Sequence, residues 1–346
     1  MQNNLPVLDQ NGLKQALRIA GGATLGFTIC KLMAWQNGIF FTIYPMLLLG
    51  LVPVLNRNII RQFVASAAFS ALIVLVVQGL FNHLPVVMIL ISFLAFAVLF
   101  YQMSTGTHFL FGATGVVSLS IQLNFASYVT ETSSIYPLII SNAVAILLSI
   151  VIAGLMHGIF ADVAPRQIRS RPAKDKSSIR HEVLLCSSVA TLSFIVFQCC
   201  DLQDSVSAQA ASVLVLFSLC WKAAGMAGWT RAVGTLIGCN IALLAQLLLY
   251  DLTDVLIFPV LILWICCFIF SRYHILGGGI PGVGFGVLTT FGILFGQSLG
   301  PNQDLVYSAL YRFSSVSVAI IASLMAIFVV HSILNKFEST RHHTYH

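Results

Sequence analysis

The stretch DVAPRQIRSRPAKDKSSIR, residues 162–180, is the one long polar segment in a chain of 346 residues. On both sides of it, apolar runs of the length that crosses a bilayer, about 17–25 residues, follow one another with short interruptions. The chain is 58% hydrophobic and only 8% charged, and the charged residues fall almost entirely between the apolar runs. A soluble helical domain needs more polar surface than this. The sequence therefore predicts an all-α, polytopic membrane protein.

The apolar runs predict about twelve transmembrane helices. They are expected at residues 15–36, 39–55, 61–81, 84–101, 108–126, 135–160, 182–200, 206–221, 230–250, 254–271, 281–299 and 306–335.

Loop charges predict the orientation. All Lys and Arg residues except Lys31 and Arg312 fall in one set of alternating loops, whereas Glu131, Asp201 and Asp251 mark the other set. Because cytoplasmic loops carry the Lys/Arg excess, both termini are expected in the cytoplasm. The first fifteen residues lack a signal-peptide pattern, so the first helix is expected to be a retained anchor. The basic charge, with a pI near 9.0, suits anionic lipid head groups and does not indicate nucleic acid.

The polar segment divides the chain into two six-helix membrane halves, residues 1–161 and 181–346, joined by a basic cytoplasmic linker, residues 162–180. Weak similarities relate the halves: Arg61 and Arg231 each open a helix that continues with small residues, and Tyr136 and Tyr307 begin the last helices. Six helices in each half predict a parallel repeat, with a substrate path between the halves. Recurrent GxxxG spacing, as at Gly22/Gly26 and Gly234/Gly238, predicts close helix packing.

Cationic residues within the apolar runs are the candidate substrate-binding residues. Lys31 and Arg312 fall inside predicted spans, where an unpaired charge costs at least about 2.5–3.5 kcal/mol. They are expected to line an outer vestibule for an anion, with Arg61 and Arg231, together with Arg18, on the inner side. The alternative is that the long side chains of Lys31 and Arg312 reach the outer interface.

Two histidines, His157 and His331, occupy matched positions near the inner ends of the sixth and twelfth spans. They are candidates for proton coupling, and ordinary interfacial histidines are the alternative. We find no nucleophile–base arrangement and no metal-site spacing among the eight cysteines. The sequence therefore predicts a protein that is not an enzyme, with no metal and no cofactor.

The two halves, with Arg61 and Arg231 each opening a third helix, GTLIGC at residues 234–239, and Arg312 in the last span, resemble the fusaric-acid-resistance (FUSC) and aromatic-acid-exporter families. The resemblance covers most of the chain, and its motifs are diffuse. It implies a bacterial inner-membrane exporter of aromatic carboxylates that works with a periplasmic adaptor of the HlyD membrane-fusion type. The six-helix half also resembles plant aluminium-activated malate channels. Many FUSC-type exporters carry a large soluble domain, whereas about twenty residues join the halves here.

Efflux of small organic anions is therefore the expected function. An anion channel and a non-transporting scaffold of an envelope complex are the alternatives, and an integral-membrane enzyme is the least favoured. The substrate, the coupling ion and the oligomeric state, including a homodimer, stay open.

Overall fold

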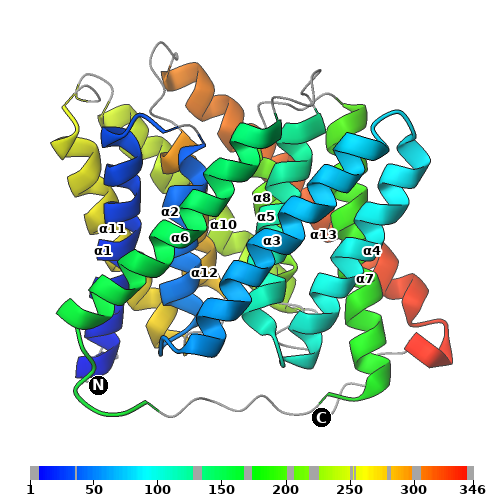
Figure 1. Cartoon of the computed structure of the whole chain (residues 1–346), viewed down its shortest axis with the longest axis horizontal. Coiled ribbons are helices and arrows are strands. Elements are labelled where there is room, and N and C mark those ends of the chain that lie inside the picture. The colour runs from blue at the N-terminus through cyan, green and yellow to red at the C-terminus, as the bar shows by residue number, and fades with distance from the viewer. Residues whose placement is uncertain are drawn as a thin grey trace, which may run out of the picture. The chain divides into compact units, whose positions relative to one another are not determined.

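A computed structural model gives the structure of the chain (Figure 1) and describes residues 8–35, 37–127, 135–166, 174–200, 206–217, 226–249, 252, 255–278, 282–297 and 305–340. Twelve α-helices and one short 3₁₀ helix account for most of this part, which contains no strand. Each predicted apolar segment overlaps one α-helix, so the all-α prediction is confirmed.

The helices have these bounds: α1 Gln10–Leu32, α2 Gly38–Leu51, α3 Arg57–Leu80, α4 Pro85–Thr105, α5 Phe109–Ser127, α6 Ile135–Ile159, α7 Lys176–Cys199, α8 Val206–Val215, α10 Met226–Leu248, α11 Ile257–Leu276, α12 Val283–Gln297, α13 Leu305–Leu334 and the 3₁₀ helix η3 Glu338–Thr340.

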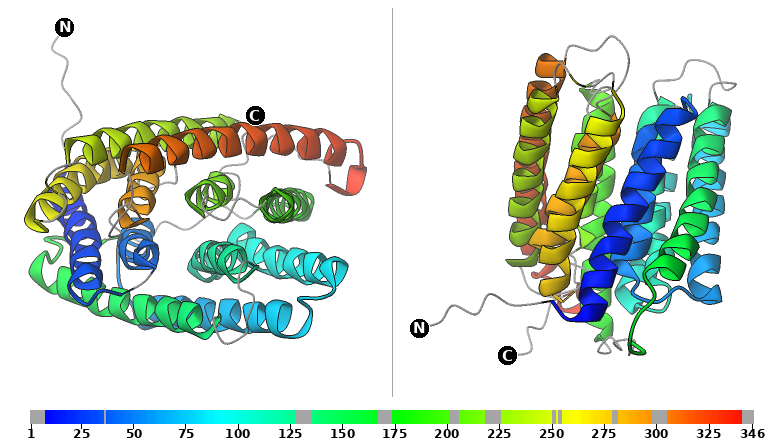
Figure 2. Two further views of the ribbon diagram at one scale, coloured as in Figure 1. Left: turned by 90° about the horizontal axis from the view of Figure 1, so that it is seen from above. Right: turned by 90° about the vertical axis from the view of Figure 1, so that its left-hand side faces the viewer.

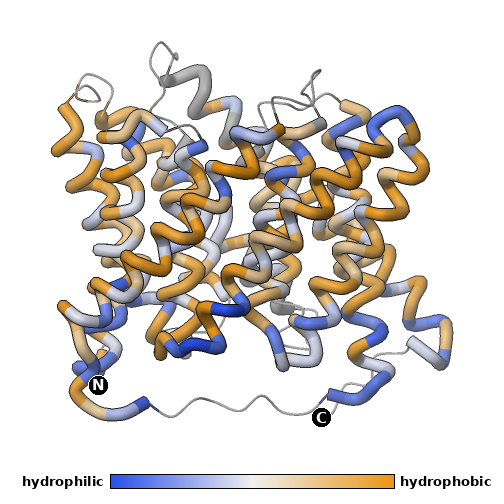
Figure 3. Tube along the Cα trace, viewed as in Figure 1, coloured by the Kyte–Doolittle hydropathy of each residue, from blue (hydrophilic) through white to orange (hydrophobic). Residues whose placement is uncertain are grey.

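Seven helices of the described part are long and apolar enough to cross a membrane. They are α3, α4, α5, α6, α7, α11 and α13. Figure 3 shows hydrophobic residues along these helices and hydrophilic residues gathered towards many of their ends. Because lipid cannot satisfy backbone polar groups, helices of this kind are the structures expected to span it. The chain thus has the architecture of a multi-pass membrane protein.

Aspartates set the starts of α1 and α7 beyond the apolar runs. The Asp9 carboxylate accepts a hydrogen bond from the Gly12 backbone N–H at 2.8 Å, and the Asp175 carboxylate accepts one from the Ser177 N–H at 3.4 Å. An acidic N-cap satisfies amides that the first turn leaves without partners. Both helices therefore begin several residues before the predicted spans, within polar sequence.

Two compact units make up the fold. Unit 1 contains residues 1–56, 145–169 and 233–310, and unit 2 contains residues 57–144, 170–232 and 311–346. Unit 1 therefore takes α1 and α2 from the first predicted half and α11 and α12 from the second. Unit 2 takes α7 and α8 from the second half and α3, α4 and α5 from the first.

The helices within each unit pack in the same order. In unit 1, α1 packs against α2 and α11, and α12 packs against α2 and α11. In unit 2, α7 packs against α8 and α4, and α5 packs against α8 and α4. In the left view of Figure 2, seen from above, α1 and α2 (blue) lie beside α11 (yellow) and α12 (orange). Substituting α7, α8, α4 and α5 for α1, α2, α11 and α12 thus reproduces the pattern of contacts.

The buried residues of corresponding helices also recur at constant displacements along the chain. In α4 and α11 they pair as Met88/Pro259, Ser92/Leu263, Phe96/Cys267, Leu99/Phe270, Phe100/Ser271 and Met103/His274. In α1 and α7 the sequence itself recurs, as ATLGF at residues 23–27 and ATLSF at residues 190–194.

Two buried positions of α3 and α10 are also related by one constant displacement along the chain. Buried Ser66 and Ser70 of α3 match buried Gly234 and Gly238 of α10. This register places Arg61 against Trp229, two positions from the predicted match with Arg231.

Glycines allow the helices to approach closely, as the GxxxG spacing predicts. A Cβ on Gly26 of α1 would lie 2.1 Å from the Phe41 carbonyl oxygen of α2. A Cβ on Gly238 of α10 would lie 2.6 Å from the Val287 oxygen of α12. Both distances are too short for a side chain, so the prediction of close packing is confirmed at these positions.

Replacing Gly26 by Ala is expected to destabilise the protein by about 2 kcal/mol, because the new methyl group forces α1 away from α2. The matched control is Gly154→Ala in α6, where nothing lies within 4 Å of the added Cβ. Ala is the better helix former, so this variant should be neutral or slightly more stable. The measurement is the thermal midpoint of the detergent-purified protein. A similar fall for both variants would contradict the assigned contact.

Polar side chains tie the first helix of each predicted half to a later segment. In unit 1, the Lys14 ammonium donates to the Ala161 carbonyl oxygen, just after α6. In unit 2, the His181 Nδ1–H donates to the Thr340 carbonyl oxygen at 2.7 Å, just after α13. Each link joins the first helix of a predicted half to the chain that follows the last helix of that half.

Candidate functional site

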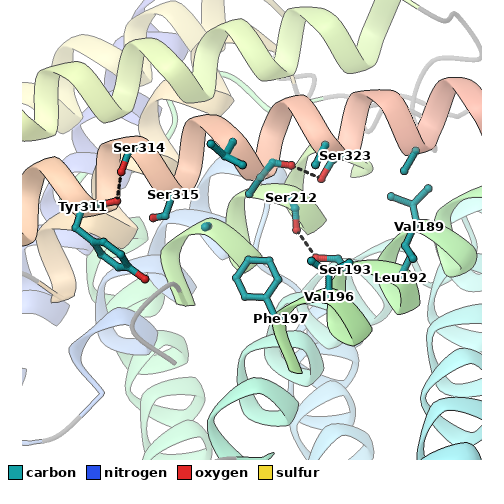
Figure 4. Close-up of a pocket in the computed structure, with 15 residues that line it drawn as sticks. Val189, Leu192, Ser193, Val196, Phe197, Ser212, Tyr311, Ser314, Ser315 and Ser323 are labelled. Carbon is teal, nitrogen blue, oxygen red and sulfur yellow. Dashed lines mark hydrogen bonds between the residues drawn. The ribbon is translucent and has the colours of Figure 1, made fainter. Parts of the chain in front are cut away.

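A pocket of about 310 Å³ lies inside unit 2, between α7, α8 and α13 (Figure 4). Its wall is mostly apolar, with hydroxyl groups placed along α7, α8 and α13. The apolar residues are Val189, Leu192, Val196, Phe197, Ala208, Val318, Ala319, Ala322 and Ala326, and the hydroxyl residues are Ser193, Ser212, Tyr311, Ser314, Ser315 and Ser323.

This wall forms because all three helices place small or apolar residues at helical spacing. Val189, Ser193 and Val196 lie one turn apart on α7, and the lining residues of α13 recur at three- and four-residue intervals. Small residues, chiefly Ala and Ser, leave the space that the pocket occupies. Its size lies at the lower end of the range for small-molecule sites, which is about 300–1,000 Å³.

The protons of several pocket hydroxyls are already used within the protein. The Ser212 hydroxyl donates to the Gln209 carbonyl oxygen at 2.8 Å, so the Ser193 hydroxyl, 2.9 Å away, is the donor to Ser212. Ser314 and Ser323 donate to carbonyl oxygens of their own helix, at 2.9 Å and 2.7 Å. These oxygens keep lone pairs that can accept a hydrogen bond from a ligand.

None of the lining residues carries a charged side chain. A mostly apolar, uncharged wall with a few hydroxyl acceptors favours a small molecule with an apolar body, such as one aromatic ring, over a strongly polar one. The charge of an anionic ligand would need a partner outside this wall.

The four predicted cationic residues lie on four different helices. Lys31 is half-buried near the end of α1 in unit 1, with its Nζ 5.8 Å from the centre of the Phe27 ring. Arg61 is exposed in the second turn of α3, in unit 2. Arg231 lies on α10 and Arg312 on α13, directly after Tyr311 of the pocket, and their side chains lie outside the described residues. The two described side chains thus belong to different units, one half-buried and one exposed.

Arg18, which the sequence places with the inner cations, has its charge compensated. Its side chain is almost fully buried in α1, and its Nη2 lies 2.7 Å from an Asp162 carboxylate oxygen. The Asp162 carboxylate also lies 3.2 Å from the Arg166 Nε. This ion pair occupies the beginning of the predicted linker, and it stabilises unit 1 instead of presenting a free cation.

The two predicted histidines have different partners. The His331 Nδ1 of α13 lies 2.8 Å from the Nε2 of His181 on α7, in unit 2. The His157 Nδ1 donates to the Ala153 oxygen of its own helix α6 at 2.8 Å, in unit 1. His181 was not singled out in the sequence, although it lies opposite the charged residue Lys14 when ATLGF and ATLSF are aligned.

The hydrogen bonds of the His181–His331 pair form a chain of matched donors and acceptors. The Thr340 carbonyl accepts from the His181 Nδ1–H, so a neutral His181 accepts at its Nε2 from the His331 Nδ1–H. The His331 Nε2 is then the acceptor for the Asn335 amide, 2.9 Å away. All donors and acceptors match with both rings neutral.

Glu182 is a second polar residue that the sequence analysis missed. It is almost fully buried in α7, and both of its carboxylate oxygens accept hydrogen bonds from the Lys174 ammonium at 2.7 Å. The ATLGF/ATLSF match places it opposite Gln15 of α1, which accepts from Arg166 in unit 1. The corresponding positions thus each receive a hydrogen bond from a linker cation.

Comparison with known families gives one match. Residues 15–156 match the model of a family described as a protein of unknown function (DUF2955). The matched segment covers under half of the chain, from α1 to near the end of α6. No curated protein and no solved structure matches.

Proposed function

We propose that this protein is an inner-membrane transporter that exports small organic anions, in particular aromatic carboxylic acids. The observation that carries the proposal is the apolar, hydroxyl-bearing pocket between α7, α8 and α13 in a protein with membrane-spanning helices. A single aromatic ring suits its size and wall. The charge distribution of the loops supports an orientation with both termini in the cytoplasm.

The carboxylate is the part of such a substrate that the pocket wall leaves without a partner. A charge inside the membrane must be paired or hydrated, and Arg312 follows the pocket residue Tyr311 on α13. We propose Arg312 as the main carboxylate partner, with Arg61, Arg231 and Lys31 along the path. The His181–His331 pair extends the proposed proton-coupling residues His157 and His331. A periplasmic adaptor of the membrane-fusion type completes the export route.

We further propose that the twelve helices form a parallel repeat of two six-helix halves, residues 1–161 and 181–346, around the linker 162–180. Three observations support it: the ATLGF/ATLSF recurrence, the equal order of helix contacts within the two units, and the shared displacement of buried residues between α4 and α11. The family match, which runs from α1 to α6, supports the same division.

Export is tested by the accumulation of radiolabelled 4-hydroxybenzoate in cells with and without the protein and a candidate adaptor. We expect lower accumulation with the protein, rising to the control level when the proton gradient is collapsed. Lowered accumulation that persists without any gradient would favour the anion channel. Equal accumulation for every aromatic acid tested would contradict the proposed function.

Filling the pocket is expected to block export without unfolding the protein. Ala319→Phe places a ring in the space between α7, α8 and α13, and we expect export to fall at least about tenfold, since a ring-sized ligand no longer fits. Val329→Phe is the matched control, because Val329 is exposed on the same helix and does not line the pocket. Equal export by both variants would show that this pocket is not on the substrate path.

A further inference from the structure

Two buried amide side chains in unit 2 have no hydrogen-bond partner among the described residues. They are Asn124 on α5 and Gln209 on α8, both fully buried. Neither the nitrogen nor the oxygen of either amide is bonded. Buried polar groups are nearly always paired, and an unpaired one loses the hydrogen bonds that water would supply. Four such atoms on two helices therefore carry donors and acceptors that the described residues leave unused.

The two amides lie on helices that pack against each other, within unit 2. Asn124 is near the end of α5, and Gln209 is in the first turn of α8. Ser120, about one turn before Asn124 on α5, adds another buried oxygen without a partner in the described part of the chain. Neither α5 nor α8 contains a charged residue. Both amides thus lie at buried positions of helices that carry no charged residue.

In unit 1 a threonine and a glycine occupy the positions that correspond to the two amides. The displacement that relates ATLGF to ATLSF, continued along the chain, sets Thr42 of α2 against Gln209. Gly112 and Gly284 make matching close contacts with α4 and α11, and their displacement sets Gly296 of α12 against Asn124. In unit 1 a Cβ on Gly296 would lie only 3.0 Å from the Thr42 hydroxyl, which itself bonds to the Gly38 oxygen.

The comparison shows what differs between the units. Where unit 1 has a glycine in direct contact with a satisfied threonine, unit 2 has two long amides with unused donors and acceptors. If the contact served stability alone, a glycine against a threonine would be the more stable arrangement, because it leaves no polar atom unpaired. The two amides are therefore better explained by a bound group that forms hydrogen bonds with them.

We propose that Asn124 and Gln209 form a neutral binding site for an uncharged hydrogen-bonding group, a hydroxyl or a carboxamide, of the transported molecule. This inference rests on the proposed function and specifies its substrate class: aromatic acids that carry such a group besides the carboxylate. A hydroxyl satisfies an amide pair because it donates to one amide oxygen and accepts from one amide nitrogen. A bare carboxylate only accepts, so it would face the amide oxygens unfavourably and without a counter-charge from α5 or α8.

The test compares two ligands that differ only by the hydroxyl. The binding of 4-hydroxybenzoate and of benzoate to the detergent-purified full-length protein is measured by calorimetry at pH 7. We expect 4-hydroxybenzoate to bind about tenfold more tightly, the ratio that one net hydrogen bond produces. In Asn124→Leu/Gln209→Met, which keeps side-chain size but removes the polar atoms, both ligands should bind equally.

The thermal midpoint separates a binding role from a structural one. The double variant should be at least as stable as the natural protein, because it removes unpaired buried groups. The matched control is Gln246→Met on α10, a buried amide whose nitrogen already bonds to the Leu294 oxygen. This variant should lose stability and keep the tenfold preference.

Each other outcome overturns the inference in a distinct way. If both ligands bind equally to the natural protein, the proposed function stands and the amide site does not. If the double variant is less stable but keeps the preference, the amides hold only structural water. If neither ligand binds, the proposed function fails for aromatic acids, and the substrate class inferred from the amides falls with it.

Discussion

Replacing Arg312 by Gln is expected to reduce export about 100-fold while leaving membrane insertion intact. An unpaired charge inside a span costs about 2.5–3.5 kcal/mol, and the same cost returns for the substrate carboxylate when its cationic partner is removed. Gln retains hydrogen-bonding capacity on α13, so the change acts mainly on charge. The measurement is the initial rate of 4-hydroxybenzoate efflux from preloaded cells at equal protein levels.

Two further variants make this result specific. Arg312→Lys keeps the charge and should retain part of the activity, because a point charge replaces the planar guanidinium. Arg272→Gln removes an exposed arginine of α11 and should leave the rate unchanged. If Arg312→Gln exports as fast as the natural protein, Arg312 does not neutralise the substrate.

Replacing Asp162 by Asn is expected to lower the free energy of unfolding by about 3 kcal/mol. The change leaves the Arg18 guanidinium, which is 1% exposed, without its counter-charge, and breaking a buried ion pair from one side is strongly destabilising. The Arg166 side chain, which also contacts Asp162, would then add a second cation to the same place. The measurement is the thermal midpoint of the purified protein in detergent.

The double variant Arg18→Met/Asp162→Leu is the informative companion. It removes both charges and leaves a long apolar side chain in the place of the arginine, so most of the lost stability should return. If the single and double variants are equally unstable, a contact of Asp162 other than its pairing with Arg18 would be the source of stability. A midpoint unchanged by Asp162→Asn would show that Arg18 is hydrated in the protein.

The helices could be predicted from the sequence because a membrane-spanning segment must be both helical and apolar along its length. The starts of α1 and α7 could not be predicted from hydropathy. Asp9 and Asp175 cap these helices within polar sequence, several residues before the apolar runs begin. The recurrence of ATLGF as ATLSF was a readable signal of the repeat, and it also aligns Glu182 with Gln15.

The candidate site could be predicted from the sequence far less well. Lys31, Arg61 and His157 were chosen for their charge and position, yet burial and partners depend on residues far away in the sequence. The partner of His331 is His181, and the partner of Arg18 is Asp162, each more than one hundred positions distant. The pocket combines small residues from α7, α8 and α13, which have no motif that sets them apart from ordinary helix packing.

An all-helical membrane protein can be predicted without a structure, because the length, hydropathy and interruption of apolar runs are local properties. Which residues are available for binding depends instead on the tertiary structure. Whether an amide such as Asn124 or Gln209 is satisfied, whether a cation such as Arg18 is paired, and whether small residues leave a pocket all depend on contacts between helices that lie far apart in the chain. These contacts arise from burial and close packing, which act between helices and leave no fixed spacing in the sequence.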